Sequence, residues 1–200
     1  MPSVAGMTYS KKRVKASDFK AIREREERAV KDELGGITRP DDRIERAAEI
    51  IRQADAEIAL HVEDRDNAVA SLWFYEQVLG LAVAIGVTPT AYREILSKAL
   101  YGDPKKQIPV GTSAEKLTRL AEEAGIKRVP DAAEKLPELA RIVAAARARR
   151  STAVVFMREA ALALSEEPYG WSGEKIAEHA GVGKKLIYQQ QRTARLARER

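Results

Sequence analysis

The chain has no cysteine and only two histidines among its 200 residues. The lack of cysteine excludes disulfide bonds and thiolate metal ligands, and it is typical of proteins from a reducing compartment. His61 and His179 are too far apart in the sequence to form a recognisable metal-ligand pair. We therefore expect no metal ion and no other cofactor.

Long apolar runs are also missing. The first twenty residues contain no apolar core of a signal peptide, and no segment approaches the roughly 20 consecutive apolar residues that cross a bilayer. These features predict a cytoplasmic protein with no membrane partner.

Aromatic residues are scarce, at 6%, and glycine and proline number only twelve and eight. No segment alternates apolar and polar residues as a half-buried strand does. The Ala- and Leu-rich composition favours helices over a sandwich or a barrel. The sequence therefore predicts an all-α protein with long helices.

Charge divides the chain into four consecutive segments. Residues 1–40 carry a net charge of +4, residues 41–103 carry −6, residues 104–140 carry +1 and residues 141–200 carry +6. We interpret these as a basic N-terminal arm with a short helix (1–40), an acidic helical domain (41–103), a linker with short helices (104–137) and a basic helical domain (138–200).

Start and stop signals locate several helices. Thr88 and Pro89 can begin a helix that Gly102 ends. Thr112 and Glu115 have the spacing of a capping box for a helix running to Gly125. Pro130 and Pro137 are expected to interrupt the chain before a second long helix over residues 138–164.

The last stretch has the pattern of a helix-turn-helix. Such a unit needs a small residue where the helices approach and a glycine four positions later in the turn; here these are Ala177 and Gly181. Apolar residues that would lock the two helices together are Ile176, Ala180, Val182 and Ile187. Ser172 can cap the first helix.

The sequence IAEHAGVGKKLIYQQ, within this stretch, resembles the DNA-reading unit of the TetR-type bacterial repressors. The resemblance covers fewer than about thirty residues and implies the DNA-reading mode alone, without a ligand-sensing domain. It implies that the recognition helix opens at Gly183 and Lys184. The residues it places against DNA are Gly183, Lys184, Lys185, Tyr188, Gln189 and Arg192, and we assign the basic residue Arg195 to the same surface.

Charge at the C-terminus favours the same assignment. Residues 183–200 hold six basic residues and one acidic residue, a local charge of +5. Because half or more of protein–DNA hydrogen bonds go to the sugar–phosphate backbone, such clustering is typical of a DNA-binding helix. The alternative is a solvated final helix whose cations complement its dipole. The arm could add phosphate contacts through Lys11, Lys12, Arg13 and Lys15.

The same template fits residues 81–95, LAVAIGVTPTAYREI, in its apolar positions. Its surroundings carry a charge of −6, which would repel phosphates. We therefore interpret it as a packing or dimerisation unit. The matches LAVAIGV with IAEHAGV and RDNAVASL with RSTAVVFM leave two explanations open: an internal duplication, or chance similarity between Ala-rich helices.

Self-association is expected through the acidic domain, where apolar residues recur at helical spacing. The residues assigned to dimerisation or packing are Ile44, Ile51, Ile58, Trp73 and Phe74. A symmetric homodimer would present two recognition helices about 34 Å apart and would bind an inverted repeat. A higher homo-oligomer is the alternative.

No nucleophile–base pair is recognisable, so the sequence predicts no enzyme activity. It predicts a protein that binds double-stranded DNA sequence-specifically and regulates transcription. Two other functions stay open: a phage- or plasmid-type packaging or partition adaptor that oligomerises on DNA, and a protein-interaction module that does not bind DNA.

Overall fold

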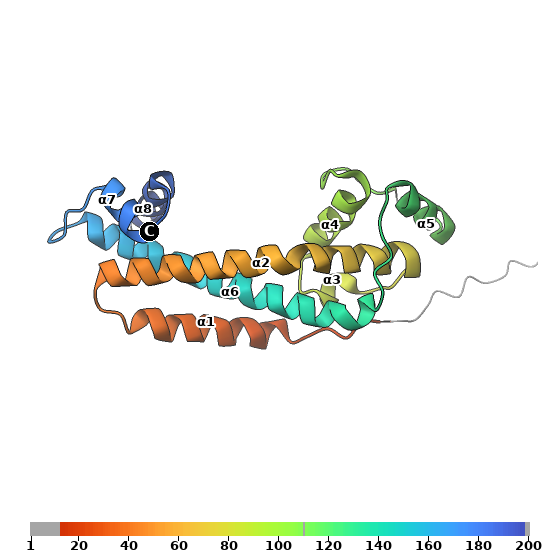
Figure 1. The fold of residues 1–200 in the computed structure, drawn as a ribbon, viewed down its shortest axis with the longest axis horizontal. Helices are drawn as coiled ribbons and strands as arrows, with labels where there is room; N and C mark the ends of the chain where they lie inside the picture. The colour runs from red at the N-terminus through yellow and green to blue at the C-terminus, as the bar shows by residue number, and fades with distance from the viewer. Residues whose placement is uncertain (1–12, 110, 199–200) are drawn as a thin grey trace, which may run out of the picture. The chain divides into compact units, whose positions relative to one another are not determined.

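A computed structural model describes residues 13–109 and 111–198. Over these residues the protein is all-α, as the sequence predicts (Figure 1). The helices are α1 (Phe19–Gly35), α2 (Pro40–Glu76), α3 (Leu81–Ala84), α4 (Pro89–Tyr101), α5 (Ala114–Glu123), α6 (Ala132–Ser165), α7 (Gly173–Ala180) and α8 (Lys184–Arg198). An isolated parallel β-bridge joins Arg13 and Leu79.

The chain forms two compact units, each built from two separate stretches. Among the described residues, unit 1 contains 13–19 and 60–143, and unit 2 contains 20–59 and 144–198. This division differs from the four consecutive segments expected from charge. The difference arises because α2 and α6 are long enough, at 37 and 34 residues, for each to supply one part to each unit.

The core of unit 1 forms where the second part of α2 and the first part of α6 meet the shorter helices. Val69, Leu72 and Phe74 of α2 are buried together with Leu136 and Ala140 of α6. Leu81 of α3, Leu96 of α4 and Leu117 of α5 belong to the same cluster. Apolar residues from all five helices therefore share one core.

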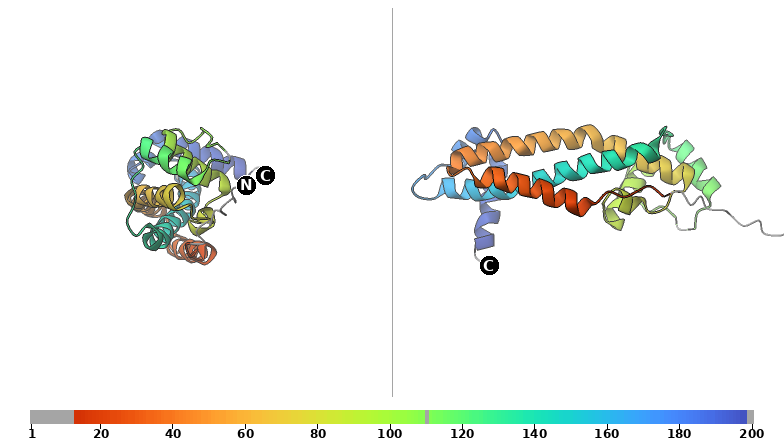
Figure 2. Two further views of the ribbon diagram at one scale, coloured as in Figure 1. Left: turned by 90° about the vertical axis from the view of Figure 1, so that its right-hand side faces the viewer. Right: turned by 90° about the horizontal axis from the view of Figure 1, so that it is seen from below.

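The core of unit 2 joins α1, the first part of α2, the second part of α6, and the final two helices. Leu34, Ile44, Met157, Ile176 and Ile187 are among its buried residues. Figure 2 shows α8 running across the direction of the longer helices of this unit. The apolar side of the closing motif is therefore part of the unit's core.

Two ion pairs orient α2 and α6 within unit 2. Arg150 Nε lies 2.6 Å from Asp55 Oδ1, and Arg149 pairs with Glu57. The residue numbers rise on one helix as they fall on the other, so the two helices are antiparallel in this unit.

The predicted caps of α4 are confirmed. Thr88 Oγ1 accepts a hydrogen bond from the amide of Ala91, and Pro89 is the first helical residue. Gly102 ends the helix with φ 68°. A left-handed residue is what glycine provides at a helix C-terminus.

Two other boundaries were predicted wrongly. Ser113, not Thr112, caps α5, because the Ser113 hydroxyl accepts from the amide of Lys116 while the Thr112 hydroxyl donates to the carbonyl of Pro109. Pro137 does not interrupt the chain but lies inside α6. It falls in the first two turns, where its missing N–H removes only the bond to the carbonyl of residue 133.

No helix in the described part of the chain has the length and apolarity needed to span a membrane.

Candidate nucleic-acid interface

Helices α7 and α8 form a helix-turn-helix. The Ser172 hydroxyl accepts a hydrogen bond from the amide of Lys175 at 3.2 Å and caps α7. Gly181 ends the helix with φ 64°. The amides of Gly181 and Val182 donate to the carbonyls of Glu178 and Ala177, respectively, in the pattern of a Schellman motif. The local sequence therefore determines both the start of α7 and the turn.

Apolar side chains fix α8 against unit 2. Ile187 is fully buried, and Ala194 is buried two turns later. Ile176, Ala177 and Ala180 of α7 are buried in the same core. Burying these groups stabilises the fold by roughly 25 cal/mol for each Å² of apolar surface that is removed from water. The orientation of α8 therefore depends on the core of unit 2.

Two buried glutamines hold the same face of α8, and the sequence analysis did not identify them. Gln190 Oε1 accepts from Arg158 Nε at 3.1 Å, and Gln191 Nε2 donates to the carbonyl of Ala161 at 3.2 Å. Both partners belong to α6. The three- and four-residue spacing from Ile187 was the available signal, since it places both side chains on the buried face.

Arg52 of α2 was missed as well. Its Nη1 donates to the carbonyl of Ala180 at 3.1 Å, at the C-terminus of α7. A cation there satisfies a free carbonyl and complements the helix dipole. His179 Nε2 lies 3.2 Å from the carbonyl oxygen of Asp41. The first turns of α2 therefore support the turn between α7 and α8.

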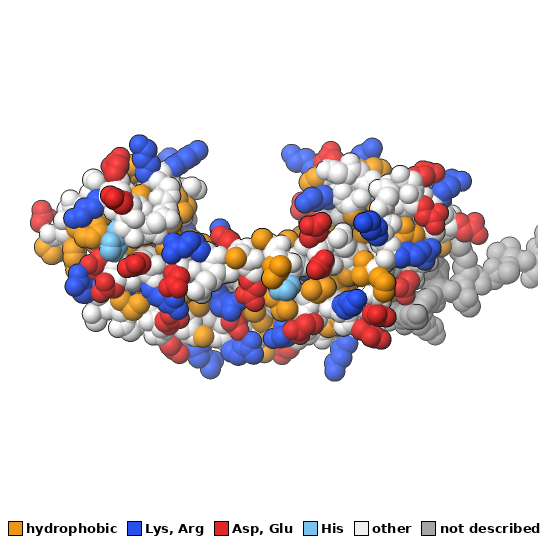
Figure 3. Space-filling model, viewed as in Figure 1, with side chains coloured by type: hydrophobic (Ala, Val, Ile, Leu, Met, Phe, Trp, Pro, Cys, Tyr) orange, Lys and Arg blue, Asp and Glu red, His pale blue; other side chains and the backbone are white. Residues whose placement is uncertain are grey.

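The opposite face of α8 is exposed and cationic. All seven residues assigned to DNA contact are exposed: Gly183, Lys184, Lys185, Tyr188, Gln189, Arg192 and Arg195. Lys184, Tyr188, Arg192 and Arg195 follow one another at spacings of four, four and three, which places them in one stripe. Figure 3 shows Lys and Arg side chains projecting from the surface of α7 and α8.

Most of these cations have no acidic neighbour in the described part of the chain. No described carboxylate lies within 4.0 Å of the charged nitrogens of Lys184, Lys185, Arg192 or Arg195. Arg198 differs, since its Nη1 lies 2.9 Å from Glu166 Oε1. The basic side chains of the stripe therefore have no ion-pair partner within 4.0 Å among the described residues. The Glu174 carboxylate beside Tyr188, whose pKa Lys184 helps to lower, is the negative charge next to the stripe.

Tyr188 is held at the start of α7. Its hydroxyl donates to Glu174 Oε1 at 3.0 Å, and this bond raises the pKa of the Tyr188 phenol. The pKa of Glu174 is lowered, first by a hydrogen bond from its own amide and then by Tyr188. A Cβ at Gly173 would lie 2.6 Å from the Tyr188 ring. Glycine at position 173 therefore allows the ring to lie over the helix end.

The arm residues are described only in part. Arg13 and Lys15 belong to unit 1, and both are exposed. Lys11 and Lys12 lie outside the described residues.

The five residues assigned to dimerisation or packing differ in exposure. Ile44 and Phe74 are completely buried in the cores of units 2 and 1, respectively. Ile51 and Trp73 are partly buried and pack against those two cores, and Ile58 is half-buried. Ile44 and Phe74 therefore have no surface to offer a second chain.

Helices α3 and α4 repeat the turn geometry in unit 1. The amides of Gly86 and Val87 donate to the carbonyls of Val83 and Ala82, and each of these positions lies 95 residues before its counterpart at the α7–α8 turn. Helices α4 and α8 also begin 95 residues apart. Their outer faces differ, because Ser97 and Leu100 are buried where Arg192 and Arg195 are exposed.

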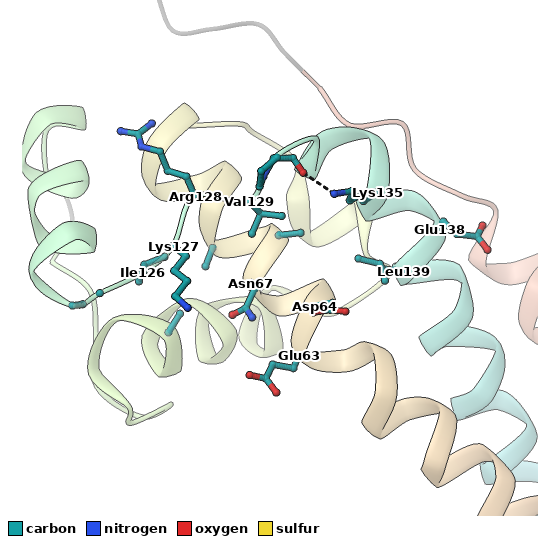
Figure 4. Close-up of a pocket in the computed structure, with 16 residues that line it drawn as sticks. Glu63, Asp64, Asn67, Ile126, Lys127, Arg128, Val129, Lys135, Glu138 and Leu139 are labelled. Atoms are coloured by element: carbon teal, nitrogen blue, oxygen red, sulfur yellow. Dashed lines mark hydrogen bonds between the residues drawn. The ribbon is translucent and has the colours of Figure 1, made fainter.

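Unit 1 also contains a cavity of about 820 Å³ between α2, α6 and the segment that precedes α6 (Figure 4). Lys135 Nζ donates to the carbonyl of Pro130 at 3.1 Å at its edge. The lining includes three acidic residues (Glu63, Asp64 and Glu138) and three basic residues (Lys127, Arg128 and Lys135). Because acidic and basic residues are equal in number, this lining favours neither an anionic nor a cationic ligand. No group of three or more acidic residues or histidines in the described ranges could hold a metal ion.

Comparisons with protein-family models, with curated proteins and with solved structures found no match.

Proposed function

We propose that the protein binds double-stranded DNA sequence-specifically by inserting α8 into the major groove, and that it is a cytoplasmic transcription regulator without enzymatic activity. The observation that carries the proposal is the two-sided character of α8. Ile187, Gln190 and Gln191 fix one face to unit 2, and the opposite face exposes four basic residues. A recognition helix needs this combination of rigid support and free outer surface.

The exposed residues match the chemistry of groove binding. Lys184 and Lys185 lie in the first turn of α8, where helix-turn-helix proteins contact the DNA. Gln189 can pair with an adenine edge, and Arg192 can pair with a guanine edge or a phosphate. Tyr188 is oriented by Glu174 and adds a hydroxyl and a ring to the same surface.

A homodimer would give the strongest discrimination between sites. Two copies of α8 about 34 Å apart would bind two half-sites of an inverted repeat. Measurement of the mass of the complex in solution distinguishes this dimer from a larger assembly of the kind a packaging or partition adaptor would form.

Duplex binding by the full chain, measured against salt concentration, tests the proposal. With four to six phosphates neutralised, log affinity should fall with log salt at a slope of roughly −4 to −5. The triple variant Lys184→Ala, Lys185→Ala, Arg192→Ala should reduce the slope to about −1 to −2. It should keep its helical content, because all three side chains are exposed.

A control variant makes the same change in net charge in unit 1. Lys116→Ala, Arg119→Ala, Lys127→Ala removes three exposed basic residues and should leave the slope within about 0.5 of the wild-type value. Equal weakening by both variants would show that net charge alone drives binding. Binding that does not depend on salt, or no binding at all, would reject the proposal.

A further inference from the structure

A second cavity in unit 1, of about 920 Å³, lies along α4. Its walls come from α4, from the connection between α4 and α5, and from the neighbouring helices. The lining includes Trp73, Tyr92, Leu96, Ser97, Lys105 and Leu117. Its volume falls within the range of small-molecule sites, which are typically about 300–1,000 Å³.

The cavity occupies the face of α4 that corresponds to the outer face of α8. Pro89, Thr90, Arg93 and Glu94 line it, and they lie 95 residues before Lys184, Lys185, Tyr188 and Gln189. Lys105 and Ile108 of the connection line the same cavity. On α4 this face therefore borders an open cavity, although Pro89, Thr90, Arg93 and Glu94 are themselves exposed, as their counterparts on α8 are.

Ser97 supplies a free hydroxyl to the cavity. The residue is only 4% exposed, and its hydroxyl forms no hydrogen bond within the described part of the chain. No fully buried side-chain oxygen or nitrogen of the described residues lacks a partner. The Ser97 hydroxyl therefore keeps some accessible surface, and the residue lines the cavity.

Positive charge dominates the lining. Arg93, Lys105 and Lys106 are basic, and Glu94 is the acidic residue among those that line it. Lys106 Nζ lies 4.2 Å from the centre of the Tyr101 ring. Arg93 and Lys105 have no ion pair within the described ranges. The balanced cavity between α2 and α6 lacks this preference for an anion.

We propose that this cavity binds a small organic carboxylate with an apolar body. The carboxylate would lie between Arg93 and Lys105, since charged hydrogen bonds are stronger than neutral ones. The apolar body would lie against Leu96, Leu117 and Trp73. Ser97 would donate a hydrogen bond to the carboxylate. The inference does not depend on DNA binding, because it concerns unit 1 alone.

Calorimetric titration of the full chain with decanoate and with decylammonium tests the charge preference. The two molecules share an apolar chain and differ in the sign of the head group. Decanoate should bind at least about tenfold more tightly, because the head group meets cations in one case and repulsion in the other. Equal affinity for the two, or no binding of decanoate at about 1 mM, would overturn the proposal.

Variants on α4 provide the matched control. Arg93→Gln should weaken decanoate binding about tenfold, and Arg93→Lys should restore most of the affinity. Lys98→Gln removes an exposed cation of the same helix that does not line the cavity, so it should change the affinity less than twofold. If Lys98→Gln weakens binding as much as Arg93→Gln, the cavity is not the site. Unchanged thermal midpoints would show that each variant is folded.

Discussion

The α3–α4 and α7–α8 regions share a turn but not a surface. Their glycines have φ values of 66° and 64°, and the hydrogen bonds at the two turns occur at corresponding positions. The first helices differ: α3 has four residues and α7 has eight. Gly80 precedes α3 in a left-handed conformation without a side-chain cap, whereas Ser172 caps α7. The two regions therefore share the turn, but the first helix of the α3–α4 region is shorter than that of the α7–α8 region.

The second helices show what the shared turn does not determine. On α8 the outer face is exposed and basic, and on α4 the corresponding face lines a cavity. A shared backbone shape can support different functions, because function depends on which side chains remain accessible. This difference in accessible side chains underlies the two proposals, nucleic-acid binding by α8 and small-molecule binding beside α4.

The largest expected effect comes from equivalent core positions of the two regions. Leu81 and Ile176 are 1% and 0% exposed and lie 95 residues apart. Truncation of either to Ala should lower the free energy of unfolding by about 3 kcal/mol, through lost burial and a new cavity. Urea denaturation measures both changes.

Duplex binding should separate the two variants under conditions where both are folded. Ile176→Ala should weaken binding, since α8 loses support, and Leu81→Ala should not. Val83→Ala, at a 69% exposed position of α3, is the stability control and should change the free energy by less than about 0.5 kcal/mol. Equal loss of duplex binding in both core variants would contradict the separate roles.

Substitution of the two turn glycines, Gly86 and Gly181, should lower the free energy of unfolding by less than the core truncations do, and by unequal amounts. A Cβ at Gly86 would lie 2.6 Å from the Phe19 ring, whereas a Cβ at Gly181 would lie 3.4 Å from Arg52 Nη1. Both substitutions incur the left-handed penalty of about 1–2 kcal/mol. Gly86→Ala should therefore destabilise by about 2–3 kcal/mol and Gly181→Ala by about 1 kcal/mol. Thermal unfolding tests the order, and a reversed order would show that the Phe19 contact is unimportant.

Local features of the fold were predictable from the sequence. Thr88, Gly102, Ser172 and Gly181 act on neighbouring backbone groups, so their roles follow from residue type and spacing. The exposure of Tyr188 and its neighbours also agrees with the helical spacing around Ile187. These signals were sufficient for the helix class and for the turn of the closing motif.

Features that depend on distant residues were not predictable. Arg52 reaches the carbonyl of Ala180 across 128 positions, and Gln191 bonds to a carbonyl of α6. The two-part composition of each unit depends on the pairing of α2 with α6. The burial of Ser97 depends on what covers α4. Spacing within one helix contains no information on its partners.

The smallest expected effect on the free energy of unfolding comes from lowering the pH, which should weaken each of the two units slightly. In unit 2, two hydrogen bonds from Arg39 lower the pKa of Asp41 below its ordinary value of 3.8. In unit 1, hydrogen bonds from Arg141 lower the pKa of Glu138 below 4.5. A lowered pKa in the folded state means that the carboxylate stabilises the fold fully above its unfolded-state pKa. This contribution is lost as pH falls through the folded-state pKa.

Each carboxylate should contribute less than about 1 kcal/mol, because its arginine partner is largely exposed to water. Asp41→Asn and Glu138→Gln should each flatten the decline in the free energy of unfolding between about pH 5 and pH 2. Asp41 should have the larger effect, since its side chain is 11% exposed and that of Glu138 is 58% exposed. Glu45→Gln and Glu134→Gln alter exposed carboxylates of α2 and α6 without an ion pair in the described ranges, so their curves should follow the wild type. A larger effect of Glu138→Gln would show that burial does not set the difference between the two units.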